Sequence, residues 1–187
     1  MTTISSMALT QGSHTLDPSA GTLQVKTYRE GVAARVGHDL VIDVAKWSAT
    51  VEVGADGAIT SIALHADPRS LAVREGLRGM KPLSDRDRAD IARTIDEKIL
   101  GGGAIELRST SCEAPSAATT SVRGELTLAG ATRPIAFDLA TGDDGRVTAV
   151  VRVVQSQWGI KPYRGLMGAL KVRNDIEIVV DARLPLA

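Results

Sequence analysis

Apolar and polar side chains alternate with a period of two through most of this 187-residue chain, and this period constrains the fold more than any other feature. Near the middle of the chain, Val122, Leu126 and Leu128 alternate with Arg123, Glu125 and Thr127. Such alternation is typical of a β-strand with one face in the core and the other in solvent. Short alternating segments recur between turn residues, so the sequence predicts an all-β protein with an antiparallel sheet.

The alternating segments predict about eight strands, closed into a barrel or folded as a sandwich. They cover about residues 22–28, 40–53, 59–66, 105–110, 122–128, 135–139, 147–154 and 172–182. The second segment is longer than most strands, and its apolar residues change parity near Ala45. A bulge or bend near Ala45 explains this change, as does a strand covered on both faces at its start.

One segment has the period of a helix. Ile91, Ile95 and Ile99 recur at every fourth position, which predicts one α-helix over about residues 84–100. Ser84 is suited to cap its first turn, and Gly101 is suited to the left-handed residue that ends it.

The composition is that of an ordinary globular protein, and it excludes several classes. With 22 basic and 22 acidic side chains the formal net charge is zero, which argues against a nucleic-acid or anionic-membrane partner, because phosphate binding needs a basic excess or a basic stripe, and the sequence shows neither. The single cysteine, Cys112, excludes an intramolecular disulfide and a cysteine-rich zinc site. No apolar run approaches the roughly 20 residues of a membrane span.

The length predicts a single domain over residues 1–187, with residues 1–12 expected to be flexible. The first ten residues have neither the basic nor the apolar region of a secretion signal. We therefore expect a cytoplasmic protein.

Histidines are the main candidates for catalysis and metal binding. His14, His38 and His65 lack the spacing of a zinc motif, so no metal or cofactor is expected. His38 precedes Asp39, but neighbours in a strand point to opposite faces, which favours a backbone hydrogen bond for His38 over an acid–base pair. No residue is assigned as catalytic. A small enzyme that uses His38 with Asp39 or Tyr163 on a hydrophobic substrate stays an alternative.

Ordered motifs along the chain resemble a known protein family. The most specific is Val122–Pro134, with the pattern Gly-x-Leu-Thr-x-x-Gly-x-Thr-x-Pro. Shorter matches keep the family's order at Gly21–Thr27, Val36–Leu40, Leu71–Val73, Asp87–Ile91, Ile105–Thr110, Trp158–Ile160 and Val172–Leu184. Together these segments resemble the YceI-like family of polyisoprenoid-binding proteins, which have a lipocalin-like β-barrel.

The resemblance implies a lipocalin-like barrel with the helix packed against it, and a long-chain isoprenoid lipid, such as a polyprenyl or quinone-type tail, as partner. It also implies a carrier or sequestering role and a homodimer. The interior departs from the family, because Leu107 stands where relatives have Phe and aromatics are only 3% of the chain. An aliphatic tube without polar anchors binds through the length of hydrocarbon that it buries, at about 0.8 kcal/mol per CH₂ before the costs of association.

The inward positions of the predicted strands are the candidate cavity lining. They are Leu23, Val25, Ile42, Ile62, Leu64, Ile105, Leu107, Leu126, Leu128, Ile135, Phe137, Leu139, Val151, Val153, Ile176 and Ile178. The candidates for the cavity mouth are His38, Trp47, Trp158, Tyr163 and Met167.

The same alternation also fits a solid barrel, because core residues and pocket residues repeat alike. A stress-associated or interaction protein with a filled barrel is therefore a further alternative.

Overall fold

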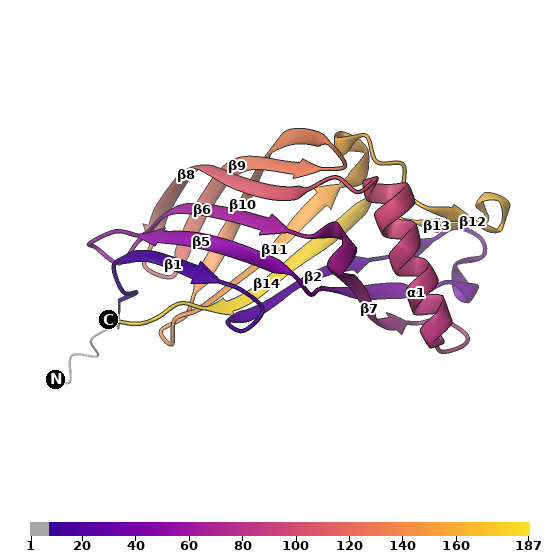
Figure 1. Cartoon of the computed structure of the whole chain (residues 1–187), viewed down its shortest axis with the longest axis horizontal. Coiled ribbons are helices and arrows are strands. Elements are labelled where there is room, and N and C mark those ends of the chain that lie inside the picture. The colour runs from indigo at the N-terminus through magenta and orange to yellow at the C-terminus, as the bar shows by residue number, and fades with distance from the viewer. Residues whose placement is uncertain (1–7) are drawn as a thin grey trace.

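One large antiparallel sheet dominates the computed structural model, which describes residues 8–187. The sheet curls around a single apolar core as a half-barrel (Figure 1), so the predicted all-β class is confirmed. In spatial order its eleven strands are β1 (Gly12–Leu16), β5 (Trp47–Val53), β6 (Ile59–Ala66), β8 (Ile105–Ser116), β9 (Thr119–Leu128), β10 (Ala131–Thr141), β11 (Arg146–Val154), β14 (Asp175–Arg183), β2 (Gly21–Thr27), β4 (Asp39–Val44) and β7 (Leu71–Leu77).

The sheet has eleven strands where the sequence predicts about eight. The long segment 40–53 divides into β4 and β5, and β1 and β7 are additional. These two extra strands are the edges of the sheet, each paired on one side only. In β7 only Leu71 and Val73 are buried before the exposed charges begin, so the alternation is too short to predict a strand.

A bend at residues 45 and 46 brings the two ends of the sheet together. β4 and β5 are consecutive in the chain, yet they lie near opposite ends of the strand order. The Ala45 N–H donates to the Ser70 carbonyl at 3.0 Å, and the Lys46 carbonyl accepts from the Asp67 N–H at 2.9 Å. The predicted bend near Ala45 is therefore confirmed. It forms a corner of the barrel, which is why the buried positions change parity there.

A second, small sheet lies at one end of the barrel. It consists of β12 (Arg164–Gly165), β13 (Leu170–Val172) and β3 (Arg29–Glu30). The last predicted strand, 172–182, is interrupted here: Val172 ends β13, and β14 begins at Asp175. Between them the Arg173 N–H donates to the Tyr28 carbonyl at 2.8 Å, which ties the small sheet to the end of β2.

The predicted helix is present and lies across the same end of the barrel (Figure 1). It consists of α1 (Asp85–Thr94) and a π-helical turn (Ile95–Leu100). Ser84 caps the first turn in a capping box with Asp87, and Gly101 ends the helix with a φ of 60°. Both terminal residues are those that the sequence indicates.

Residues 1–7, which belong to the segment expected to be flexible, lie outside the described residues. Leu9 is buried and forms an isolated antiparallel bridge with Leu186, and β1 begins at Gly12. None of the helices within residues 8–187 has the length and apolar character needed to cross a bilayer.

Candidate functional site

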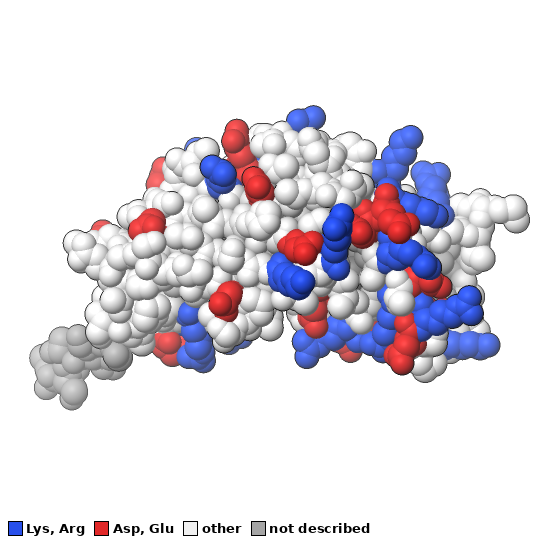
Figure 2. All heavy atoms as spheres, in the orientation of Figure 1, with Lys and Arg blue, Asp and Glu red and all other residues white. Residues whose placement is uncertain are grey.

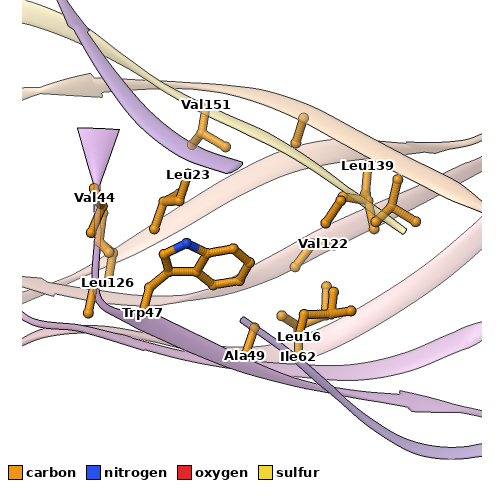
Figure 3. Close-up of a cluster of buried hydrophobic side chains, with 14 of the residues drawn as sticks. Leu16, Leu23, Val44, Trp47, Ala49, Ile62, Val122, Leu126, Leu139 and Val151 are labelled. Carbon is orange, nitrogen blue, oxygen red and sulfur yellow. The ribbon is translucent and has the colours of Figure 1, made fainter. Parts of the chain in front are cut away.

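The interior of the curled sheet is hollow. A cavity of about 680 Å³ runs through it, with a size inside the roughly 300–1,000 Å³ range of small-molecule sites. Figure 3 shows side chains from several strands converging on this interior, among them Leu23, Trp47 and Leu126. The barrel is therefore not filled by its own side chains.

Fifteen of the sixteen candidate lining residues line this cavity in the structure. They are Leu23, Val25, Ile42, Ile62, Leu64, Ile105, Leu107, Leu126, Leu128, Ile135, Phe137, Leu139, Val151, Ile176 and Ile178. Their shared inward direction follows from the period of two, because successive strand residues point to opposite faces.

Val153 is the exception. It has the same parity as Val151, but it lies next to the turn at Gln155–Trp158 that ends β11. Its side chain is only 1% exposed and does not line the cavity. Parity predicts the inward face correctly here, but it does not predict that neighbouring atoms fill the space beyond that face.

The helix supplies lining residues that the strand pattern does not predict. Ile91, Ile95 and Ile99, together with Leu83 before the helix and Leu100 at its end, face the cavity. The sequence does predict that this face of the helix is buried, because a stripe of isoleucines packs against an apolar surface. Only the position of the helix across the barrel end shows that this surface borders a cavity.

The π-helical turn keeps the isoleucine stripe on one face. In an α-helix, residues four apart drift by about 40° because 3.6 residues make a turn. The wider π turn has more residues per turn, so the same spacing drifts in the opposite direction. The step from Ile91 to Ile95 lies in α1 and the step from Ile95 to Ile99 lies in the π turn, so the two drifts oppose each other.

Polar lining residues gather at the end of the cavity next to the helix, which we call the mouth. They are Thr27, Arg29, His38, Lys81, Asp87, Asp90, Thr94, Gln155, Tyr163 and Lys171. The opposite end is lined by apolar residues such as Leu139, Val147 and Leu184. The expectation of a tube without polar anchors is therefore wrong at one end, because the loops that leave the strands there carry charged side chains. Figure 2 shows charged side chains crowded at this end, and a mostly uncharged barrel wall.

The five predicted mouth residues occupy three different environments. His38 and Tyr163 line the mouth, as the sequence indicates. Trp47 lines the cavity but is only 7% exposed and lies among the core side chains (Figure 3). Trp158 and Met167 do not line the cavity. Trp158 is 3% exposed and donates its indole N–H to the Leu126 carbonyl at 2.7 Å, whereas Met167 is fully exposed.

His38 and Asp39 make separate interactions. His38 Nε2 lies 2.6 Å from the Lys81 carbonyl, and because a carbonyl only accepts, Nε2 carries the proton in this bond. The buried Asp39 carboxylate accepts from the Arg29 backbone N–H at 2.9 Å and pairs with Arg78 at 3.4 Å. The backbone hydrogen bond expected for His38 is present. Asp39 fixes the loops around it and does not orient the imidazole.

The rim of the mouth is tied together at Tyr28. Its hydroxyl donates to Glu177 Oε2 at 2.5 Å, and the Arg173 guanidinium lies over its ring, 5.4 Å from the centroid. The hydrogen bond to Glu177, followed by desolvation, raises the pKa of Tyr28 to about 12.

We expect Tyr28 to titrate near pH 12 in a Tyr163→Phe variant, where it is the only tyrosine. Its raised pKa favours the neutral phenol in the folded protein. This contribution to stability is therefore complete below pH 10 and is lost between about pH 10 and pH 12. Ultraviolet absorbance of the phenolate measures the titration, and adding Glu177→Gln should lower the midpoint. A midpoint that Glu177→Gln leaves unchanged would contradict this assignment.

The described residues offer no metal centre: within residues 8–187, no three His, Cys, Asp or Glu side chains come together as a ligand set. Burial raises the pKa of the Cys112 thiol, which disfavours the reactive thiolate. The lining itself makes the site an apolar cavity with one polar end.

Comparison with known proteins gives a family match and a set of structural neighbours. A family model described as YceI-like domain matches residues 14–184. No curated protein matches the chain.

Several solved structures share the fold at low sequence identity. Burkholderia cenocepacia BcnA has a TM-score of 0.59 at 13% identity, and the match covers 85% of this chain and 94% of BcnA. A polyisoprenoid binding domain from Saccharophagus degradans, described as implicated in plant cell wall breakdown, has a TM-score of 0.52 at 8% identity. The match covers 94% of this chain and 100% of that domain. The Campylobacter jejuni YCEI protein has a TM-score of 0.52 at 12% identity, and the match covers 76% of this chain and 83% of that protein.

Proposed function

The chain belongs to the YceI-like family, and on this premise we propose that it binds a long-chain isoprenoid lipid in the barrel cavity. The observation that carries the proposal is the continuous apolar cavity of about 680 Å³. A polyprenyl or quinone-type tail is a chain of branched hydrocarbon units, and an aliphatic tunnel accommodates such a chain without polar partners. The Saccharophagus degradans neighbour, a polyisoprenoid binding domain of the same fold, supports this ligand class.

The volume suggests the length of chain that the cavity accepts. An apolar cavity of about 150 Å³ in a protein core binds one benzene molecule. On that scale a cavity of about 680 Å³ holds between four and five such rings, or about 25 carbon atoms. This corresponds to about five isoprene units, so a longer lipid would extend through the mouth.

The wall supplies a large driving force with little directional specificity. At about 0.8 kcal/mol per buried CH₂, a chain of this length gains roughly 20 kcal/mol before costs. Immobilising the chain and losing its free translation and rotation offset much of that gain. Affinity should therefore grow with chain length up to the capacity of the cavity and change little with further units.

The polar mouth sets the direction of the ligand. Thr27 lines the cavity, and its buried hydroxyl makes no hydrogen bond within residues 8–187. Charged side chains such as Lys81 and Lys171 line the same end. A ligand that enters tail first keeps its polar end beside these groups, where the cost of desolvation is smallest.

The biological role that we propose is that of a carrier or sequestering protein. Within residues 8–187, His38 and Asp39 at the mouth have separate partners and form no acid–base pair. A non-covalent site of this kind stores its ligand and releases it unchanged. A homodimer through an edge strand such as β1 or β7 stays a prediction, as does a cytoplasmic location.

Tryptophan fluorescence tests this proposal, because the chain has two tryptophans and only Trp47 lines the cavity. We expect a polyprenol of about five units to change the emission of the Trp158→Phe variant and to leave that of Trp47→Phe unchanged. Native mass spectrometry of the purified protein should also show lipid that organic solvent removes. Failure to recover any lipid, together with constant Trp47 emission on adding polyprenol, would contradict the proposal.

A further inference from the structure

Exposed apolar side chains are concentrated around the mouth. The structure records eight large hydrophobic residues that are highly exposed within residues 8–187, and seven of them lie in segments 28–38, 77–83 and 159–172, which we call the mouth loops. The seven are Val32, Val36, Leu77, Met80, Tyr163, Leu166 and Met167. The eighth, Val150, lies on the barrel wall in β11. Single exposed hydrophobics are ordinary on a protein surface, but such a concentration indicates an interaction site.

The mouth loops form one connected surface. β3 and β13 pair in the small sheet, and the Ala33 N–H donates to the Ala169 carbonyl at 2.9 Å. The third segment joins through His38 Nε2 and the Lys81 carbonyl, 2.6 Å apart. Figure 1 shows the small sheet and its loops projecting at the end of the molecule opposite the C-terminus.

The same surface is strongly basic although the chain has zero net charge, because its basic residues come from three separate segments and form no stripe in the sequence. The net charge therefore does not exclude an anionic partner at this surface. The mouth loops carry seven lysines and arginines and one acidic residue, Glu30, which gives a formal charge of +6. Only Arg78 of these basic residues takes part in a salt bridge among residues 8–187, and Arg29 donates to the Gly37 and Arg78 carbonyls. The other five have no acidic partner there: Arg35, Lys81, Lys161, Arg164 and Lys171. They are therefore free to meet a negatively charged partner.

The acidic side chains of α1 that line the mouth do not cancel this charge, because they already have partners. The Asp87 carboxylate accepts hydrogen bonds from Ser84, and the Asp90 carboxylate pairs with Arg86 and Arg93.

The backbone holds apolar side chains outward at the tip of this surface. Leu166 and Met167 have φ angles of 48° and 54°, in the left-handed region that bulky residues avoid. Leu166 is 59% exposed and Met167 is fully exposed. Strained backbone of this kind persists where the surrounding structure enforces it and is concentrated at functional sites.

We propose that the mouth loops dock on the surface of an anionic phospholipid bilayer. The basic residues attract the negatively charged head groups, and the exposed apolar tip inserts into the boundary between head groups and acyl chains. Docking in this orientation places the mouth of the cavity against the membrane. The proposal concerns the loops alone, and it stands whether or not the cavity holds an isoprenoid.

Co-sedimentation with lipid vesicles tests the docking surface. We expect the purified protein to bind vesicles of phosphatidylcholine mixed with phosphatidylglycerol, and to bind pure phosphatidylcholine at least about tenfold more weakly. Charge attraction is screened over about 8 Å at physiological salt, so binding to the anionic vesicles should weaken as the salt concentration is raised.

Two variants separate the basic and the apolar parts of the surface. The double variant Arg35→Gln with Arg164→Gln should weaken binding to the anionic vesicles by about 25-fold. Met167→Asp should weaken it by about tenfold or more, because the inserted side chain is lost. The controls, Arg123→Gln and Val150→Asp, make the same kinds of change on the exposed barrel wall, an arginine to glutamine and an exposed apolar side chain to aspartate, and should bind normally.

Three results would overturn the proposal. The first is the absence of binding to anionic vesicles, and the second is equal binding to neutral and anionic vesicles. The third is a dimer in size-exclusion chromatography that Met167→Asp converts to a monomer, because the surface would then join two copies of the chain.

Discussion

Leu107→Asp should weaken uptake of an isoprenoid lipid by at least about a hundredfold while leaving the protein folded. Leu107 faces the cavity from β8, where it pairs with Leu64 on one side and Leu126 on the other. In the empty protein, water in the cavity can hydrate the introduced carboxylate. A hydrocarbon chain removes that water and leaves a charge in an apolar wall, which costs several kcal/mol. The penalty therefore falls on binding and not on folding.

Titration with a polyprenol, followed by Trp47 emission, measures this loss, and circular dichroism verifies the fold. Thr110→Asp is the matched control, because it adds the same carboxylate to an exposed position of the same strand. Leu107→Met, which keeps an apolar wall of similar volume, should bind almost normally. Normal uptake by a folded Leu107→Asp protein would exclude this part of the wall from the binding site.

Trp158→Ala should lower the free energy of unfolding by about 4 kcal/mol, the usual cost of truncating a fully buried aromatic side chain. Trp158 is 3% exposed, and its indole N–H is hydrogen-bonded to Leu126 in the middle of the sheet. The substitution leaves a void and removes the hydrogen bond to the Leu126 carbonyl, at the place where the turn after β11 packs on β9. Thermal unfolding should show a decrease in Tm of roughly 10 °C.

Two comparisons make this result specific. Trp158→Phe keeps most of the buried surface and loses the hydrogen bond, so it should cost only about 1–2 kcal/mol. Met167→Ala removes a fully exposed side chain and should change stability by less than about 0.5 kcal/mol. Equal effects of Trp158→Ala and Met167→Ala would contradict the structural role of Trp158, because both residues would then behave as surface groups of the mouth.

The contrast between Trp158 and Met167 shows a difference in burial that the sequence does not predict. Both lie in the segment between β11 and β14, among glycines and charged residues, and both were predicted at the mouth. Nothing local to the chain distinguishes a tryptophan that packs beneath a turn from a methionine at the tip of a loop. The difference depends on contacts with β9, which is about 30 residues away in the chain.

The sequence predicts too few strands for a similar reason. Interior strands such as β9 and β11 bury every second residue, so their period is visible in the sequence. β1 and β7 pair on one side only, and β7 changes from buried Leu71 and Val73 to exposed charges within its own length. An edge strand is defined by the neighbour that it pairs with and not by its composition.

By itself, the sequence determined the properties that depend on neighbouring residues: the alternation that turns one face of each strand inward, the change of parity near Ala45, and the helix between Ser84 and Gly101. Only the tertiary structure decided that the inward faces surround open space, that the helix lies across one end, and that Val153 is packed outside the cavity. The physical reason is that burial of a side chain depends on its direction, which the local period sets. Whether the space beyond that side chain holds protein or remains open depends on how far the sheet curls, and distant strands determine that together.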